Sequence, residues 1–176
     1  MFLLRRKYRP LLGLDITTSS VKLIELAMAG GQYRVESYAA EPTPQNAMNE
    51  KAIVDAEAVG EAMHLMAKDD AGISGDAAIT KVIQMPRSLR ERDLESQVEM
   101  QADQYIPFPM DEVSYDFEVL GASEKDTDTN DVLLVATRTE NVEQRQAAVS
   151  AAGLTAKIVD VEAFALENAC RLMTHQ

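Results

Sequence analysis

The sequence has little cysteine, little histidine and no long uncharged apolar run. A single cysteine, Cys170, among 176 residues excludes a framework of internal disulfides and is typical of a reducing compartment. Two histidines, His64 and His175, are too few and too widely separated to indicate a zinc site. No apolar stretch is long enough to span a bilayer, and residues 1–4 are too short for the apolar region of a signal peptide. We therefore expect a cytosolic chain.

Basic residues are also scarce, because the formal net charge is -12 at pH 7. Nucleic-acid surfaces need positive potential to displace counterions, so this balance argues against a nucleic-acid partner. Several of the basic residues that are present cluster within residues 1–10. We expect this segment to be a flexible basic N-terminus, with contact to anionic lipid or to an acidic partner as the alternative.

The most informative stretch is an apolar run interrupted by an acid, a hydroxyl-rich turn and a lysine. Asp15 ends the first apolar run, Lys22 lies inside the second, and the turn between them contains Thr17, Thr18, Ser19 and Ser20. An unpaired carboxylate is costly to bury. Hydroxyls and turn amides bind phosphate oxygens, and an acid can hold hydrated Mg²⁺. The stretch predicts either a phosphate site with its metal ion or an ordinary β-hairpin with a solvated lysine.

Apolar periodicity predicts a mixed α/β chain. Strands are expected at residues 11–16, 20–28, 32–40, 78–85, 113–119, 132–137 and 154–161, and the first three should form an antiparallel meander. Residues 73–76 read as a weak loop or a poor strand. Helices are expected at residues 55–68, 140–152 and 162–173, with Gly153 as a left-handed terminator. A further helix should start at the capping box Ser88–Glu91 and stop before Pro107.

The order of these elements predicts that one unit is inserted into another. Residues 86–153 form a self-contained αββα pattern, and residues 11–85 together with 154–176 make up the rest. Side chains that could carry chemistry receive structural interpretations. Cys170 lies on the apolar stripe of the last helix and is expected to be packed, His64 is expected to be solvated or partly packed, and Met63, Met66 and Met85 are expected in the core.

Four segments resemble the PilM family, the cytoplasmic actin-like proteins of type IV pilus assembly, and more distantly FtsA. They are GLDITTSSVKLIEL (13–26), AITKVIQMP (78–86), QADQYIPFP (101–109) leading into VSYDF (113–117), and GLTAKIVDVEAFALE (153–167). The resemblance implies the N-terminal lobe of an actin-like ATPase fold that carries an inserted FtsA-type subdomain. It also implies that the second phosphate loop, the adenosine pocket and the opposing lobe lie beyond Gln176. Residues 68–76, with Asp69, Asp70 and Asp76, look shorter and more polar than the corresponding family segment.

The resemblance implies a nucleotide site that uses ATP and Mg²⁺. Six residues align with the first phosphate loop of the family: Asp15, Thr17, Thr18, Ser19, Ser20 and Lys22. Asp15 would hold the Mg²⁺ indirectly, through water. Thr17 replaces a glycine often found in the family, and a β-branched residue disfavours positive φ, so we expect weakened nucleotide affinity. One loop cannot enclose ATP and Mg²⁺, so we expect no ATPase activity from this chain alone.

The resemblance also implies a protein partner. In the family, a groove on this half of the molecule binds the N-terminal peptide of PilN, an inner-membrane protein. The chain would then be a cytoplasmic scaffold, peripheral to the inner membrane through PilN, with the binding located at the inserted subdomain and its neighbouring groove. The alternatives are an actin-like nucleotide-binding protein or ATPase, and a small-molecule kinase of the same superfamily, for which no sugar pocket is evident.

We predict that the isolated chain self-associates. A lobe that lacks its opposing half should expose apolar surface where that half would pack, and the helix at residues 162–173 is the expected place. Light scattering at high protein concentration should therefore detect oligomers or aggregates. A monodisperse monomer under these conditions would contradict the prediction.

Overall fold

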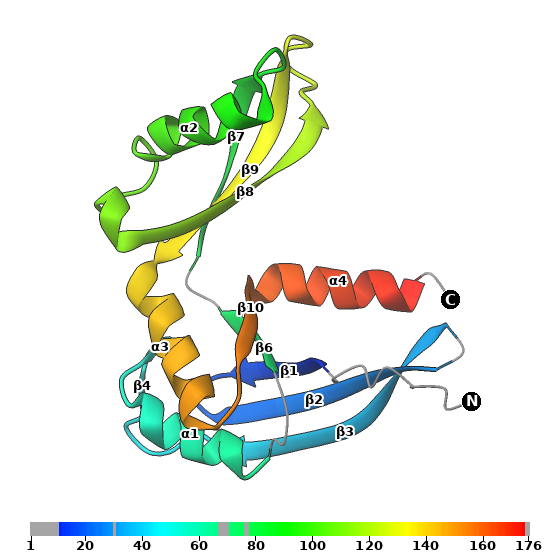
Figure 1. Cartoon of the computed structure of the whole chain (residues 1–176), viewed down its shortest axis with the longest axis vertical. Coiled ribbons are helices and arrows are strands. Elements are labelled where there is room, and N and C mark those ends of the chain that lie inside the picture. The colour runs from blue at the N-terminus through cyan, green and yellow to red at the C-terminus, as the bar shows by residue number, and fades with distance from the viewer. Residues whose placement is uncertain (1–10, 30, 67–70, 76–77, 175–176) are drawn as a thin grey trace, which may run out of the picture. The chain divides into compact units, whose positions relative to one another are not determined.

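The computed structural model describes residues 11–29, 31–66, 71–75 and 78–174 (Figure 1). Within these ranges the chain is mixed α/β, as expected, and forms two compact units. Unit 1 consists of residues 1–76 and 143–176, and unit 2 consists of residues 77–142. The expected basic segment at residues 1–10 and residues 68–70 and 76 of the shortened region lie outside the described residues.

Unit 1 contains a five-stranded mixed sheet. Its strands, in spatial order, are β10 (Ala156–Val161), β6 (Ala71–Gly75), β1 (Leu11–Ile16), β2 (Ser20–Ala29) and β3 (Gln32–Pro42). The antiparallel meander of the first three strands is confirmed. The segment that read as a weak loop or a poor strand is β6, which pairs in parallel with both β1 and β10 and is therefore an interior strand.

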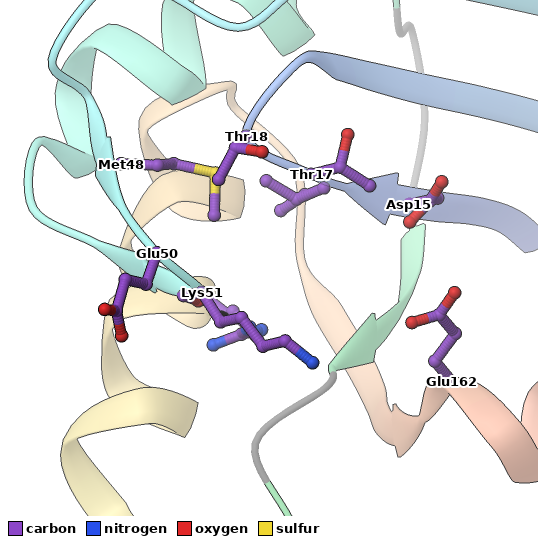
Figure 2. A pocket seen from close by; sticks show the side chains of 9 residues that line it. Asp15, Thr17, Thr18, Met48, Glu50, Lys51 and Glu162 are labelled. Atoms are coloured by element: carbon purple, nitrogen blue, oxygen red, sulfur yellow. Dashed lines mark hydrogen bonds between the residues drawn. The ribbon is translucent and has the colours of Figure 1, made fainter.

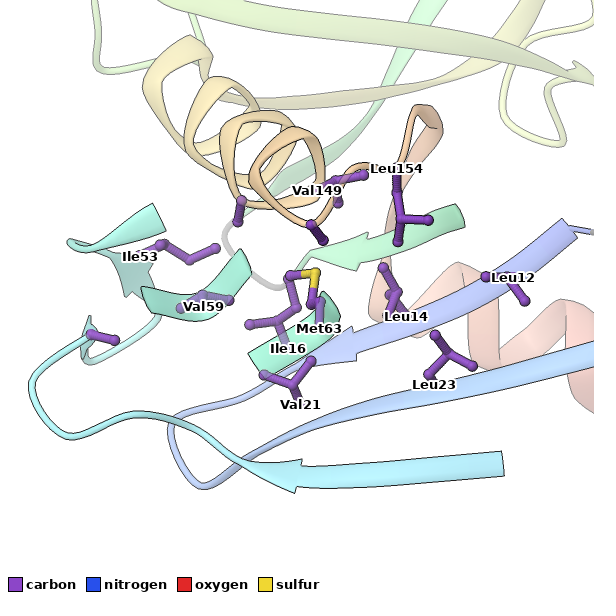
Figure 3. Close-up of a cluster of buried hydrophobic side chains, with 13 residues drawn as sticks. Leu12, Leu14, Ile16, Val21, Leu23, Ile53, Val59, Met63, Val149 and Leu154 are labelled. Atoms are coloured by element: carbon purple, nitrogen blue, oxygen red, sulfur yellow. The ribbon is translucent and has the colours of Figure 1, made fainter. Parts of the chain in front are cut away.

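One face of β1 and β2 forms the core of unit 1 (Figure 3). Alternate residues such as Leu12, Leu14, Val21 and Leu23 are buried on this face, as the period of a strand requires. They pack under α1 (Ala56–His64) and the second half of α3 (Thr139–Ala151). The predicted helix at residues 55–68 is shorter than expected, and its N-cap is the side chain of Asp55, which accepts from the Ala58 amide at 3.0 Å.

The two helices that cover this core touch at a glycine. A Cβ atom added at Gly60 of α1 would lie 2.5 Å from the Cβ of Ala151 and 2.7 Å from the carbonyl oxygen of Ala148, both on α3. The absent side chain therefore permits the close approach. Beyond α3, Gly153 has φ of 77° and ends the helix, which confirms the predicted left-handed terminator.

The other face of the same sheet is only partly covered. α4 (Glu162–Thr174) contacts β10 and β6 on this face. Its outward side chains are exposed, including Leu166 at 63%. The expectation of a packed thiol is wrong, because Cys170 is exposed on this same helix.

The expected core positions of Met63 and Met85 are confirmed, and Met66 packs against the core of unit 1. His64 is exposed, with its Nδ1 3.0 Å from the carbonyl oxygen of Ala152.

Unit 2 is a three-stranded antiparallel sheet with one helix on it. The elements are β7 (Ile79–Pro86), β9 (Thr129–Arg138) and β8 (Val113–Ala122) in spatial order, with α2 (Glu91–Ala102) and the 3-10 helix η1 (Met110–Glu112). The core of unit 2 joins α2 to the inner face of the sheet. Burial raises the pKa of Tyr115 on this face, and the carboxylates of Glu99 and Glu95 on α2 raise it further.

Two sequence expectations about unit 2 differ from the structure. The predicted capping box is wrong, because α2 starts at Glu91 with Arg90 as N-cap and no side-chain cap. The Leu89 amide donates to the Pro86 carbonyl, so Ser88 lies in a turn that precedes the helix. The expected boundaries of the insert, 86–153, also differ from the division of the structure at 77 and 142. β7 pairs along its length with β9, while the second half of α3 belongs to the core of unit 1.

We predict that Gly60→Ala destabilises unit 1. In an exposed helix this change stabilises by about 1 kcal/mol, but here the new methyl group meets the backbone of α3. Overpacking of this kind costs about 1–3 kcal/mol, so the free energy of unfolding in urea should fall. Glu61→Ala, at the exposed neighbouring position of α1, is the control and should leave stability within about 0.5 kcal/mol. Unchanged or increased stability of Gly60→Ala would contradict the close helix contact.

Candidate functional site

The charged residues of the β1–β2 hairpin form an ion pair. Asp15 and Lys22 are directly opposite each other in the antiparallel ladder. Their side chains meet across the strands, with Lys22 Nζ donating to Asp15 Oδ2 at 2.7 Å. Both side chains are about two-fifths exposed. The pairing explains how apolar strands carry both charges without an unpaired carboxylate.

The pKa of Lys22 reflects this pairing. The hydrogen bond to Asp15 and the negative charge of Asp15 raise the pKa of Lys22 above 10.5, and Tyr38 and Glu162 add smaller contributions of the same sign. Partial desolvation opposes these effects but is a lesser cause. The ammonium group is therefore the stable form of Lys22 at all ordinary pH values.

The hydroxyl of Thr17 closes the hairpin turn. It donates to the Ser20 carbonyl at 2.8 Å and accepts from the Ser20 amide at 3.1 Å. The Thr43 hydroxyl donates to the Thr17 carbonyl at 2.7 Å and ties the turn to the segment after β3. Among the described residues, the non-glycine residues with positive φ are Asn46 and Glu50. Thr17 therefore occupies this turn without left-handed backbone strain.

A pocket of about 510 Å³ opens beside this turn (Figure 2). We call it the phosphate-loop pocket. Three segments far apart in the sequence line it together with the hairpin. The lining residues are Asp15, Ile16, Thr17 and Thr18 from the hairpin, Met48, Glu50 and Lys51 from the β4–β5 hairpin (Met48–Asn49 and Ala52–Ile53), Arg145 from α3, and Glu162 at the start of α4.

A second surface lies on the partly covered face of the unit 1 sheet. It is a groove of about 550 Å³ between the sheet and α4, and we call it the apolar groove. Its lining is largely aliphatic and aromatic, with Asp15, Lys22 and Asp160 as its charged members. The other lining residues are Leu12, Gly13, Leu14, Leu23, Ile24, Leu26, Tyr33, Tyr38, Ile158 and Ala165.

The structure separates the six residues that the sequence placed in one site. Asp15, Thr17 and Thr18 line the phosphate-loop pocket, whereas Ser19 and Ser20 line neither this pocket nor the apolar groove. Lys22 instead lines the apolar groove, where it is paired with Asp15. The charged pocket residues that sequence reasoning missed are Glu50, Lys51, Arg145 and Glu162. No local pattern marks them, because they reach the pocket only through the packing of the β4–β5 hairpin, α3 and α4.

Arg145 connects two of these walls. It is 3% exposed, and its Nη2 donates to the Lys51 carbonyl at 3.3 Å. Glu50, next to Lys51, has φ of 52°, a conformation that non-glycine residues rarely adopt. A buried guanidinium on α3 therefore holds the tight β4–β5 turn against the core of unit 1.

Comparison with known proteins relates this arrangement to one family. A family model described as "Type IV pilus assembly protein PilM" matches residues 13–176. The chain belongs to the PilM family. A solved structure described as a "PilM-PilN type IV pilus biogenesis complex" contains a chain that is 29% identical, with a TM-score of 0.76 over 88% of this chain. This PilM-family chain spans 48% of that relative's length.

A second solved structure is more distant. It is a Bacteroides thetaiotaomicron protein with an actin-like ATPase fold and unknown function, 8% identical with a TM-score of 0.44. The match covers 94% of this PilM-family chain and 57% of the other, and the likeness is too low to support an argument. Within the described residues of this PilM-family chain, no helix is both long and apolar enough to cross a membrane.

The phosphate-loop pocket of this PilM-family chain fits a phosphate ligand with a hydrated metal ion. Its volume lies within the range of small-molecule sites. Mg²⁺ in phosphate sites commonly uses one or two carboxylates, with waters and phosphate oxygens completing its shell. Asp15 can supply one such carboxylate, although the described residues contain no cluster of three metal-binding side chains. Three acids, Asp15, Glu50 and Glu162, line the pocket. A metal ion bound with the phosphate would reduce the repulsion between the phosphate and these carboxylates.

We predict that Asp15→Asn lowers the pKa of Lys22 toward 10.5, since Asp15 is the main cause of the raised value. Because folding raises this pKa, the pair stabilises the fold below pH 10.5. That contribution is lost as pH rises through the folded-state pKa. Side-chain NMR titration of labelled lysine measures the change in the pKa of Lys22. Glu25→Gln, on the same strand as Lys22, is the control. A wild-type Lys22 pKa at or below 10.5 would contradict the ion pair.

Proposed function

We propose that this chain is a scaffold component of type IV pilus assembly that binds the N-terminal peptide of PilN. The observation that carries the proposal is the likeness to the PilM–PilN complex, which covers 88% of this chain at 29% identity. Membership of the PilM family over residues 13–176 supports it further. In this proposal the chain lies on the cytoplasmic face of the inner membrane and is held there by its partner.

Two apolar surfaces are suited to a peptide. The first is the apolar groove in unit 1, where Tyr38 is 63% exposed. The second is the open face of the unit 2 sheet, where Val82 is 51% exposed and pairs with Leu133 in the ladder. Large exposed apolar side chains that gather on one surface are typical of protein interaction sites. Each surface lies within one unit, so a single substitution can alter one surface and leave the other unchanged.

Nucleotide binding is the second candidate function. The observation that favours it is the phosphate-loop pocket, in which Asp15, Thr17 and Thr18 share one cavity with Lys51. We do not assign ATP hydrolysis to this chain. Phosphoryl transfer requires groups placed around the phosphate from several directions, and the hairpin turn provides one of them. In this second candidate ATP and Mg²⁺ are bound without turnover by this chain.

We predict that the chain binds a synthetic peptide from the N-terminus of PilN in calorimetric titration. A scrambled peptide of the same composition is the control and should give no heat of binding. Binding of the peptide in the absence of nucleotide would support the scaffold function. No binding at peptide concentrations well above micromolar, with the chain shown to be folded, would contradict it.

Two variants and one control identify the surface that binds the peptide, because affinity should fall in the variant that alters that surface. Tyr38→Ser alters the apolar groove, and Val82→Ser alters the open face of unit 2. Val35→Ser is the matched control, because Val35 is 60% exposed on β3 but does not line the groove.

A separate titration with ATP and Mg²⁺ tests the second candidate. Binding of ATP that is lost in Asp15→Ala would support it.

A further inference from the structure

The lysine that the family motif assigns to phosphate is already engaged. Lys22 Nζ lies 2.7 Å from Asp15 Oδ2, and its side chain lines the apolar groove rather than the phosphate-loop pocket. The hydroxyl of Thr17 is likewise committed to its own turn. A phosphate in this pocket would therefore need its positive charge from another residue.

Lys51 lies in the right place to supply that charge. It follows the positive-φ residue Glu50 at the tip of the β4–β5 hairpin and lines the pocket. Figure 2 shows its side chain extending across the pocket toward the side where Asp15 and Glu162 lie, with Thr17 and Thr18 on another wall. The ammonium group of a lysine is a compact charge with three donors, which suits phosphate oxygens.

Lys51 is also held in place by the core of the unit. Its carbonyl accepts from the Arg145 guanidinium at 3.3 Å, and Arg145 itself is buried. Arg145 precedes Ala148 and Val149 by about one helical turn, so the same face of α3 that packs on the sheet carries the guanidinium. Preorganisation of this kind reduces the entropy that a flexible hairpin would lose on binding a ligand.

We propose that Lys51 is a phosphate-binding residue of the phosphate-loop pocket and that Arg145 is its positioning residue. The ligand class is a polyphosphate, such as a nucleoside diphosphate or triphosphate with its metal ion. The Lys51 ammonium binds phosphate oxygens from the wall formed by the β4–β5 hairpin, and Thr18 binds from the other wall. This inference rests on the nucleotide-binding candidate, and not on PilN binding.

The test is a fluorescence titration of the full chain with trinitrophenyl-ATP and Mg²⁺. Lys51→Ala should raise the dissociation constant about tenfold, because a hydrogen bond to a charged group is worth about that factor in affinity. Lys51→Arg should retain most of the binding. Lys125→Ala is the matched control, since Lys125 is an exposed lysine of unit 2 and its loss changes the net charge equally. Its dissociation constant should equal that of the wild type.

A second readout separates the phosphate contact from binding of the base or the dye. Inorganic tripolyphosphate should displace the probe from the wild type and should do so about tenfold less well from Lys51→Ala. Because Lys51 is exposed, Lys51→Ala should melt at the wild-type temperature. Probe binding by the wild type that is equal in Lys51→Ala would overturn the role of Lys51 alone. No probe binding by the wild type would overturn both this inference and the nucleotide candidate, whereas peptide binding would be unaffected.

Discussion

The close contact between α1 and α3 at Gly60 is the constraint on which the rest of unit 1 depends. Because Gly60 has no side chain, α3 can approach until its backbone lies almost against α1. That approach buries Val149 and Met63 over the sheet. It also sets the position of Arg145, whose guanidinium reaches the β4–β5 hairpin. The geometry of the pocket wall is thus determined by helix packing, and not by the hairpin sequence.

The β1–β2 hairpin shows how one motif can serve two surfaces. Asp15 borders both the phosphate-loop pocket and the apolar groove, since it lies next to the end of β1, a strand whose two faces are differently covered. Lys22 neutralises it on the groove side. On the pocket side, Glu162 at the start of α4 and Glu50 of the β4–β5 hairpin add two further carboxylates. A ligand bound on one side would therefore alter the electrostatic environment of the other side through a shared carboxylate.

Periodicity predicted the strands and helices of this chain well, because strong apolar alternation is a local property. The meander, the terminator at Gly153 and the buried methionines all follow from it. The capping box failed because Pro86 and Leu89 close a turn that takes up Ser88. The packed thiol failed because an apolar stripe on α4 does not specify what covers it. Lys51 and Arg145 could not be assigned from sequence, since 94 positions separate two residues that touch.

The core of unit 1 is discontinuous, and this has a consequence for synthesis. Leu12 and Leu14 share their core with Ala152 and Leu154, and all the residues of unit 2 lie between them in sequence. During translation the first strands leave the ribosome long before the segment that seals them. The apolar face of the sheet can make non-native contacts during this time. Unit 2 is continuous in sequence and can complete its own fold first. This sheet face is therefore incompletely covered until Leu154 has emerged from the ribosome.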